Sequence, residues 1–484
     1  MAILRKPERS SSRNGRERTF AASQRRDEAG PSGSLTFASL PDTLAVLLDV
    51  ALPNIAKGPL IRRPAAVRMA ERLGLDRRAV RRMQALRARY GPGPLMLRLP
   101  GRRQAVLLEA AHARRVLDET PEPFAAASSE KRAALAHFQP EGVLISSGSA
   151  RAERRHLNEL ALDANKPCHR LSDRFAEVIA REAHTLTENA EPPGFGWHAF
   201  HDAWYRAVRT AVLGEGARDD RRLTEMLDRL RRDANWAFLK PRHDALRRRF
   251  EARLDSHLSR AEPGSIAAML VAMPRGPDAA PAGQVPQWLF AFDAAGIATL
   301  RALALLSAHP EAATRARNEA FARGTELPFL RACLLESVRL WPTTPMILRQ
   351  TTRATEWEGR QMPPGTGVLI LAPFFCRDEE RLPFADRFTP ELWLSAGEAE
   401  RRGVLPFSIG PAACPGRNLV LLFASHFLAD LLRQGWVHPT APTGLDSAGP
   451  LPATLDHLRL CFGPNTTTDA GQNCRSSGLG KFIG

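Results

Sequence analysis

Cys414 is the residue whose setting in the sequence points most clearly to chemistry. Phe407 and a turn glycine, Gly410, precede it, and Gly416 and an apolar helical segment follow it. We expect the first N–H groups of that helix, and the positive end of its dipole, to favour thiolate over thiol. A thiolate held in this way suits one axial bond to a porphyrin iron. The alternative is a buried structural cysteine at a helix start.

The spacing Phe-x-x-Gly-x-x-x-Cys-x-Gly resembles the haem-binding loop of the cytochrome P450 family, the haem-thiolate monooxygenases. The resemblance implies a mainly α fold with a small β portion, formed as a single large haem-binding domain over residues 41–462. It also implies one haem b (iron protoporphyrin IX) per chain. Cys414 is then the iron ligand, and Phe407, Gly410 and Gly416 belong to the cofactor-binding loop.

Two arginines resemble the family's partners of the anionic haem propionates. Arg349 lies on a predicted strand, and Arg155 lies in a helix that starts near residue 148. Arginine suits this role because its planar fork pairs carboxylates bidentately. The chain departs from the family pattern at Arg151, where an aromatic residue or His is usual, although Arg151 or Arg154 could substitute for it. It also departs at Ala412, where Arg or His is usual, so one usual propionate contact is absent. We therefore expect Arg349 and Arg155 to carry more of the contact, although Arg349 could also be a surface residue at a strand edge.

Glu336 and Arg339 lie three residues apart and can pair on one face of a helix. Because their neighbours are apolar, we expect a buried bidentate ion pair. The two residues match the family's Glu-x-x-Arg motif, and Arg387 stands where the third partner of that motif falls. The resemblance implies a structural triad of Glu336, Arg339 and Arg387 that fixes the segment leading to Cys414.

Gly296 and Thr299 resemble the oxygen-activating segment of the family and are the expected catalytic residues. A glycine inside a helix costs up to about 1 kcal/mol relative to alanine, which is understandable if the helix bulges there to admit O₂. Thr299 is expected to hydrogen-bond bound oxygen and to guide protons. Ala298 stands where the family has an acid, and Asp293 points to another face of the helix. The alternative is an ordinary core helix.

The resemblance implies a small apolar organic substrate, O₂, and electrons from a separate protein. No Gly-x-Gly-x-x-Gly fingerprint for a flavin or nicotinamide cofactor is present. The net charge of +16 suits an acidic donor such as a ferredoxin or flavodoxin with its reductase, and Arg417, Arg151 and Arg154 are expected on the docking face. By analogy, the substrate-pocket candidates, each equally acceptable as core, are Phe124, Phe138, Ala291, Ala295, Met346 and Ile347.

Two other functions stay open, and a third is not expected. The missing acid permits peroxide-driven oxidation, isomerisation or dehydration, whereas Thr299 favours O₂ activation. A non-catalytic haem sensor is the second alternative. Nucleic-acid binding is suggested only by the pI of about 10.6. The basic residues form no aromatic-interleaved patch or known module, so we expect no nucleic-acid partner.

Composition limits the location of the protein. The six cysteines form no Cys-x-x-Cys pair, so a zinc ribbon and a dithiol redox motif are not supported, and a reducing, cytoplasmic location is expected. Residues 44–53 are too few to span a bilayer. Residues 288–308 are numerous enough but contain Asp293 and Arg301, so we expect a core helix and no membrane anchor.

The two ends of the chain differ from its middle in composition. Residues 1–40 are rich in Ser, Arg and Gly without apolar periodicity, and we expect a disordered basic segment. Such a start is also typical of a mitochondrial transit peptide, which Asp27 and Glu28 do not suit. Residues 463–484 are expected to form a polar tail.

Overall fold

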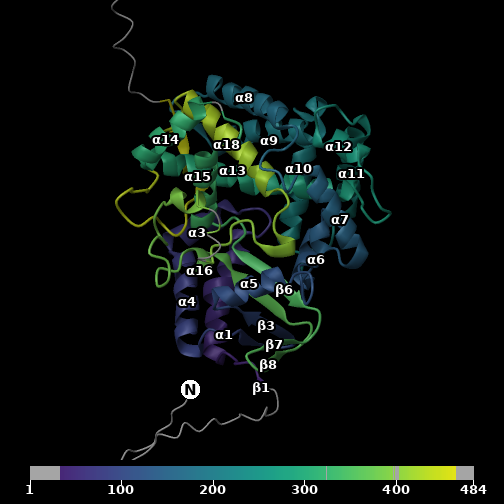
Figure 1. Ribbon diagram of the computed structural model, residues 1–484, viewed down its shortest axis with the longest axis vertical. Coiled ribbons are helices and arrows are strands. Elements are labelled where there is room, and N and C mark those ends of the chain that lie inside the picture. The colour runs from purple at the N-terminus through teal and green to yellow at the C-terminus, as the bar shows by residue number, and fades with distance from the viewer. Residues whose placement is uncertain (1–32, 323, 396, 398–402, 465–484) are drawn as a thin grey trace, which may run out of the picture.

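The computed structural model describes residues 33–322, 324–395, 397 and 403–464 of the 484-residue chain. The long helices α8, α9, α13, α15 and α18 gather at one end of the molecule, and most of the labelled strands lie at the other (Figure 1). The expected mainly α fold with a small β portion is therefore confirmed. The predicted N-terminal segment lies largely, and the C-terminal tail almost entirely, outside the described residues, although residues 33–40 contribute a short strand and the start of the first helix.

The described α-helices are, in chain order, α1 Leu40–Val46, α2 Leu52–Lys57, α3 Pro64–Arg72, α4 Leu75–Tyr90, α5 Ala110–Asp118, α6 Ser129–Leu135, α7 Gly148–Ala161, α8 Ser172–Glu188, α9 Trp197–Leu213, α10 Arg221–Ala234, α11 Asp244–Arg260, α12 Ile266–Ala272, α13 Val285–Ala308, α14 Pro310–Phe321, α15 Pro328–Leu340, α16 Ala372–Cys376 and α18 Arg417–Arg433. One π-helical turn, Leu47–Ala51, joins α1 to α2.

The strands form three small sheets. The largest has the order β2-β3-β9-β6-β4, with bounds β2 Leu95–Leu99, β3 Arg102–Val106, β4 Phe124–Ala125, β6 Met346–Thr351 and β9 Gly367–Leu371. Neighbours in it are antiparallel except β3 and β9, which are parallel. The other sheets are β1-β8-β7 (Gly33–Ser34, Arg360–Met362, Thr355–Trp357) and β10-β11-β5 (His438–Pro439, Cys461–Gly463, Phe195–Gly196).

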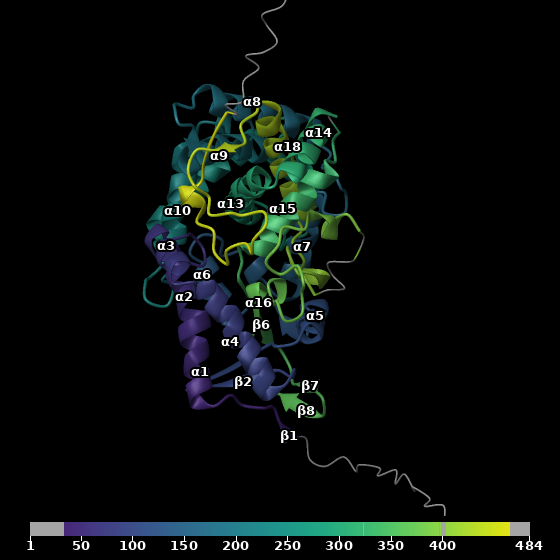
Figure 2. The ribbon, with the colours of Figure 1, turned by 90° about the vertical axis from the view of Figure 1, so that its left-hand side faces the viewer.

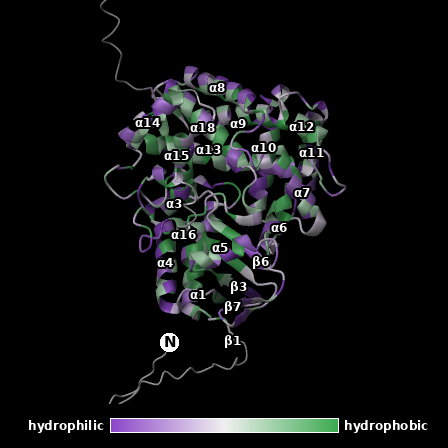
Figure 3. Cartoon of the chain, viewed as in Figure 1, coloured by the Kyte–Doolittle hydropathy of each residue, from purple (hydrophilic) through white to green (hydrophobic). Residues whose placement is uncertain are grey.

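Two large hydrophobic cores correspond to the two ends of the molecule. In the helical core, Phe292 of α13 lies edge-on to Phe423 of α18, with 5.0 Å between the ring centroids, and Trp204 of α9 packs on the same ring at 5.3 Å. The second core packs the five-stranded sheet against α4 and α5. The outer side of α4 is hydrophilic (Figure 3). The helices thus bury one face each, as amphipathic surface helices do.

α13 runs through the middle of the helical core. Within the described residues, the segment 282–308 is the one helix long and apolar enough to cross a membrane, but 72% of its most apolar window is buried inside the protein. This burial agrees with the core helix expected over residues 288–308.

Candidate functional site

Cys414 lies in a tight loop directly before α18. Its backbone N–H donates to the carbonyl oxygen of Phe407 at 2.9 Å, which folds the loop back on itself. The N–H of Gly416 donates to the Cys414 sulfur. Phe407, Gly410, Cys414 and Gly416 are thus brought together as the sequence predicts, with the sulfur at the start of the last long helix.

Gly410 is the position in this loop that only glycine fits. Its φ of 70° lies in the left-handed region that side chains disfavour. A Cβ at this position would lie 2.3 Å from the carbonyl oxygen of Leu117, at the end of α5. The loop therefore packs directly against the backbone of α5, and this contact sets its position in the fold.

The surroundings of Cys414 shift the pKa of its thiol in opposite directions. Burial raises the pKa of Cys414, while the Gly416 N–H and the charges of Arg155 and Arg417 lower it. The helix-start effect therefore acts in the expected direction, and burial, the larger cause, opposes it. A thiol of this kind becomes a thiolate when a bound metal ion supplies the compensating positive charge.

Arg155 on α7 holds the cysteine loop from the side. Its Nη1 donates to the carbonyl oxygen of Ala413 at 2.6 Å, and its Nε donates to the carboxylate of Glu159 at 2.5 Å. Because Arg155 already has a carboxylate partner, its main role here is to join α7 to the loop. The expectation that it is one of the main cations free for a cofactor carboxylate is not supported by these contacts.

Three other cations lie near enough to influence one another's ionisation. Arg349 of β6 is 97% buried, its Nε donates to Thr120 Oγ1 at 3.0 Å, and its Nη1 donates to the Leu348 carbonyl at 3.0 Å. Lys131 of α6 donates through Nζ to the same carbonyl at 3.1 Å. The Nε of Arg151 is buried without a hydrogen-bond partner. In the part of the chain that the structure describes, no ion pair within 4 Å involves any of the three.

The pKa of each of the three groups is lowered, which reflects the electrostatic cost of this arrangement. Burial and then Arg349 lower the pKa of Lys131 to about 7. Burial and then Arg151 lower the pKa of Arg349 to about 10. Burial and then Arg155 lower the pKa of Arg151. Buried charges are normally paired, so a group with two carboxylates would satisfy these cations. The thiol and the three cations together fit a haem with its two propionates.

Sequence reasoning found Arg349, named Arg151 only as a possible substitute for the family's usual residue, and missed Lys131. Arg151 counted as a departure from the family pattern, yet it lies near enough to Arg349 for its charge to lower the pKa of Arg349. Lys131 gave no signal, because a single lysine in a short helix is most often solvated. Only the fold brings it to the Leu348 carbonyl.

Thr299 and Gly296 occupy neighbouring turns of α13. Thr299 is fully buried, and its hydroxyl donates to the Ala295 carbonyl at 2.8 Å. A Cβ at Gly296 would lie 3.2 Å from Nε1 of Trp204, which donates to the Phe292 carbonyl at 2.8 Å. α13 is a continuous α-helix through this point. The predicted bulge is therefore wrong, and the small residue makes room for an indole ring.

Asp293 contacts groups away from Thr299. This agrees with the prediction that it points to another face of the helix. Its carboxylate accepts from Nη2 of Arg231 at 2.5 Å, and His201 lies 3.8 Å away. Asp293 therefore does not replace the acid missing at Ala298.

Glu336 and Arg339 form the expected pair, and both side chains are fully buried. Arg339 donates through Nε and Nη2 to the two oxygens of Glu336, at 2.8 and 2.6 Å. Its Nη2 also donates to the Arg387 carbonyl at 2.6 Å. Glu336 accepts from the Thr389 N–H and from Trp393 Nε1, at 2.8 and 2.9 Å. The predicted side-chain triad is therefore wrong at Arg387, which is exposed and contributes only its carbonyl group.

The substrate-pocket candidates divide into two groups. Phe124 and Phe138 are fully buried in different cores, where they pack on Trp357 at 6.0 Å and on Phe290 at 5.7 Å between ring centroids. They are core residues, and Ala295 is also buried. The remaining candidates are half-buried and keep accessible surface, namely Ala291, Met346 and Ile347.

The fold and the site together define a mainly α protein with a cysteine loop at the start of its last long helix. Residues 291–441 match the family model "Cytochrome P450", which supports membership of the cytochrome P450 family. The family implies a haem cofactor, in agreement with the fit of Cys414 and the three cations.

Relatives and solved structures are consistent with this assignment. The chain is 33% identical over 171 residues to cyclooctat-9-en-7-ol 5-monooxygenase of Streptomyces melanosporofaciens, covering 31% of this chain and 37% of that protein. It is 35% identical over 100 residues to the mitochondrial 1,25-dihydroxyvitamin D(3) 24-hydroxylase of Mus musculus, covering 20% and 19%. The alignments thus span well under half of each relative.

Solved structures match over much more of the chain. A crystal structure of a cytochrome P450, CYP102L1, has a TM-score of 0.66 and covers 90% of this chain and all of that chain at 18% identity. Retinoic-acid-bound cyanobacterial CYP120A1 has a TM-score of 0.64 and covers 78% and 93% at 17% identity. At these identities the matches support the fold alone.

Proposed function

We propose that the protein is a haem-thiolate monooxygenase with one haem b per chain, inserting one atom of O₂ into a small organic substrate of largely apolar character. The observation that supports this most directly is the sulfur of Cys414, held by the Gly416 N–H, in a chain of the cytochrome P450 family. Two relatives carry the words monooxygenase and hydroxylase in their names, which favours oxygen insertion. When bound, the haem supplies the iron at which O₂ is activated.

The residues around Cys414 have distinct tasks in this proposal. Cys414 ligates the iron, and the Phe407 carbonyl and Gly416 N–H fix the direction of its sulfur. Arg349, Lys131 and Arg151 bind the propionates. Arg155 keeps the loop against α7 through the Ala413 carbonyl. The cofactor is thereby oriented by groups from four separate segments of the chain.

Proton delivery depends on Thr299 because no carboxylate stands beside it. Its hydroxyl donates to the Ala295 carbonyl, which leaves the oxygen lone pairs available to accept from a water molecule. A hydroxyl that accepts from water on one side can donate toward a reacting atom after rotating about its C–O bond. We therefore propose that Thr299 orders a water chain that replaces the usual acid.

The electron donor is proposed to be a separate acidic protein such as a ferredoxin or flavodoxin. Of the three expected docking arginines, Arg417 is exposed and lies three residues from Cys414. Arg154 is bound to the Asp278 carbonyl and the Ser146 hydroxyl, and Arg151 is half-buried near Arg349. The docking face is therefore centred on Arg417. The free cysteines support a reducing, cytoplasmic location.

A spectrum of the reduced protein with carbon monoxide tests the proposal. The wild type should show the red-shifted Soret band typical of thiolate ligation, and Cys414→Ser should lose it. Cys461→Ser is the matched control, since Cys461 is also half-buried but lies in β11, and it should keep the band. An unchanged band in Cys414→Ser would contradict the proposal.

Peroxide-driven or non-oxygenating chemistry, such as isomerisation or dehydration, is a second candidate, favoured by Ala298 and by the engagement of Asp293 with Arg231. Product yield with NADPH and donor proteins should exceed yield with peroxide if O₂ activation is the natural reaction. The reverse order, or product formed without either oxidant, would favour the second candidate. A haem sensor would give no product in any arm.

A further inference from the structure

A small pocket beside α13 is rich in cations. It has a volume of about 50 Å³, which is room for several water-sized groups but not for a whole organic substrate. Its walls come mainly from residues 57–76, α13, the connection from α15 to β6, and residues 453–457. The last of these segments lies against α13 and is drawn in yellow in Figure 2. The charged residues that line the pocket are Lys57, Arg62, Asp76 and Arg301.

The one carboxylate that lines this pocket is already engaged. Lys57 donates through Nζ to one oxygen of Asp76, and the Thr454 hydroxyl donates to the other at 2.6 Å. Lys57 and Asp76 therefore balance each other. Arg62 and Arg301 are left in the pocket without a counter-charge.

Backbone carbonyl groups hold the two arginines in place. Arg62 donates to the carbonyls of Gly58 and Thr343, at 3.1 and 2.7 Å. Arg301 donates to the Leu455 carbonyl through Nε and Nη2, at 3.1 and 2.6 Å. Among the residues that the structure describes, neither guanidinium forms an ion pair within 4 Å. The carbonyls orient both groups but do not neutralise their charge.

The ionisation of the two arginines reflects this surplus of positive charge. Burial and then Arg62 lower the pKa of Arg301 to about 10. The carboxylates of Asp456, Asp76 and Glu71 oppose this decrease only in part. Burial also lowers the pKa of Arg62. An anion bound between the two guanidiniums would favour the charged form of both.

His457 supplies an additional hydrogen-bonding group in the same pocket. It is 97% buried, and its Nδ1 has no hydrogen-bond partner in the described part of the chain. Its ring packs edge-on against Trp197, with 4.5 Å between the ring centroids. Burial and then Arg301 lower the pKa of His457 well below its usual range, so the ring is neutral and can donate one N–H. Because a buried polar atom without a partner is costly, a ligand oxygen would be stabilising here.

The pocket adjoins the part of α13 that carries a substrate-pocket candidate. Ala291, Ala294, Ile297 and Arg301 are three, three and four residues apart, so each is a surface neighbour of the next. Ala291 and Ala294 are half-buried and keep accessible surface, whereas Ile297 and Arg301 line the pocket. One face of α13 therefore leads from Ala291 to the cations.

The start of β6 meets the pocket from another side. Pro345 lines the pocket and directly precedes Met346, which is also a substrate-pocket candidate. Thr299 lies on a different face of α13, because it is two residues, or about 200° around the helix, from both Ile297 and Arg301. The pocket therefore lies beside the proposed oxygen-activating residue and not at it.

We propose that this pocket binds the carboxylate of the substrate, which is then an organic acid with an apolar body. Arg62 and Arg301 pair with the carboxylate oxygens, and His457 donates to one of them. The apolar body extends along Ala291 and Met346 toward the cofactor. A carboxylate fits better than a larger anion, because the pocket is small and a planar guanidinium matches a planar carboxylate. The reaction of this acid rests on the proposed function, whereas its binding does not.

Calorimetric titration of the full-length, haem-loaded protein at neutral pH tests the proposal with three probes. Dodecanoate carries a charge and an apolar chain, dodecanol carries the chain alone, and acetate carries the charge alone. Dodecanoate should bind at least tenfold more tightly than dodecanol, because only its carboxylate makes charge-assisted hydrogen bonds. Acetate should bind far more weakly than dodecanoate. Dodecanoate should also shift the Soret band to shorter wavelength, because a bound substrate displaces the water ligand of the iron.

The ratio of the dodecanoate and dodecanol affinities isolates the contribution of the charge. Arg62→Gln should lower the affinity for dodecanoate at least tenfold and leave that for dodecanol unchanged. His457→Phe should lower the affinity for dodecanoate about fivefold, because one hydrogen bond is lost. Arg62→Lys keeps the charge without the planar fork and should restore part of the ratio. Because both ligands are measured on the same variant, a partial loss of folded protein does not change the ratio.

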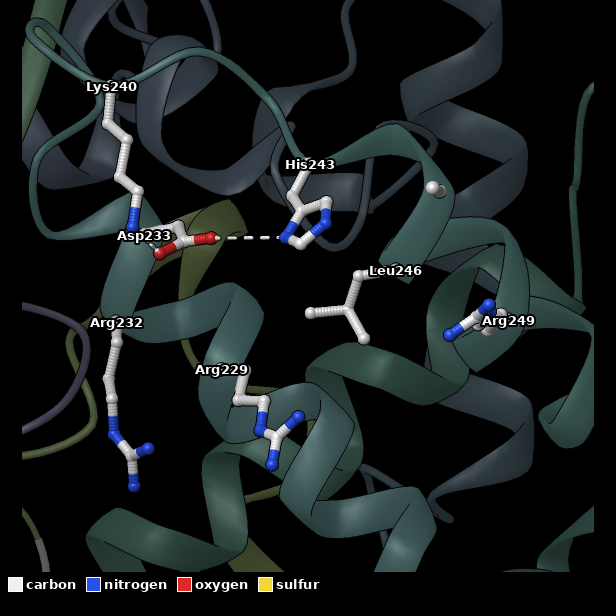
Figure 4. Close-up of a pocket in the computed structure, with 8 residues that line it drawn as sticks. Arg229, Arg232, Asp233, Lys240, His243, Leu246 and Arg249 are labelled. Atoms are coloured by element: carbon white, nitrogen blue, oxygen red, sulfur yellow. Dashed lines mark hydrogen bonds and ion pairs between the residues drawn. The ribbon is translucent and has the colours of Figure 1, made fainter.

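Arg232→Gln is the matched control, since it removes the same charge elsewhere. Arg232 is exposed and lines a separate basic hollow between α10 and α11, together with Arg229 and Arg249 (Figure 4). This variant should keep the wild-type ratio. An equal decrease of the ratio in Arg62→Gln and Arg232→Gln would contradict the proposal, because net charge alone would then explain it.

Two further outcomes would overturn the proposal. One is equal affinity of the wild type for dodecanoate and dodecanol. The other is acetate binding that depends on Arg62 while dodecanoate leaves the Soret band unchanged, which would assign the pocket to a small free anion. A wild type without the thiolate-type carbon monoxide band would instead contradict the proposed function, and the calorimetric ratio would still report on the anion site.

Discussion

The ionisation of Lys131 connects a single side chain to cofactor binding. Burial and Arg349 bring its pKa from 10.5 to about 7, so Lys131 is largely neutral at alkaline pH until an anion binds beside it. The haem propionates favour the charged form, and cofactor binding should therefore take up a proton above about pH 7. Haem affinity should then fall as the pH rises from about 7, and it should be independent of this group below that value.

Lys131→Gln should remove this part of the pH dependence and weaken haem binding about tenfold at pH 7, because one charge-assisted hydrogen bond is lost. The rate of haem transfer to a high-affinity acceptor protein, followed from pH 6 to pH 9, measures both effects. Lys166→Gln is the control, since Lys166 is exposed and paired with Asp163. A pH profile that is identical in wild type and Lys131→Gln would contradict the assignment.

At the scale of elements, a buried ion pair within α15 holds the segment before the cysteine loop, because Arg339 donates to the Arg387 carbonyl and Glu336 accepts from the Thr389 N–H. Glu336→Gln leaves the Arg339 guanidinium without its counter-charge, and we expect a loss of about 3–5 kcal/mol in the free energy of unfolding. Urea unfolding measures this loss. Glu177→Gln removes an exposed partner of Arg174 on α8 and should cost less than about 1 kcal/mol. Similar values for both variants would mean that the buried pair is not structural.

The same elements show what sequence can and cannot predict. Glu336 and Arg339 were predictable because their spacing alone places them on one helix face. Their outer partners were not, because backbone carbonyl and N–H groups, such as those of Arg387 and Thr389, are the same in every residue type. The role of Gly296 was likewise hidden, since Trp204 lies 92 positions earlier in the chain.

At the scale of the whole molecule, the excess of positive charge should attract an acidic electron donor. We expect this attraction to act mainly through exposed cations near the cofactor, such as Arg417. Arg417→Glu should slow reduction by an acidic donor at low ionic strength at least severalfold, because it reverses a charge at the docking face. Stopped-flow reduction at two salt concentrations measures this. Arg317→Glu, which carries the same charge change on α14, should leave the rate within about twofold; equal slowing would point to net charge alone.

The helix-rich class and the cysteine loop followed from sequence because both depend on local patterns. The grouping of Lys131 with Arg349, and the exposure of Leu40, Leu44 and Leu48, depend on how distant segments assemble. Residues 44–53 appeared only as an apolar stretch too short to span a bilayer. Which side of that stretch faces outward is decided by α4, against which the helix packs through Val46 and Val50.

The additional residue in the turn Leu47–Ala51 sets the rotational phase between the two halves of one helix. Removing any single residue there would restore ordinary α-helical winding and rotate α2 by about 100° relative to α1. Leu52 and Ile55 would then leave the line of Leu40 and Leu44. The number of residues in this turn, more than the identity of any one leucine, therefore keeps the exposed apolar side chains aligned on one side of the helix.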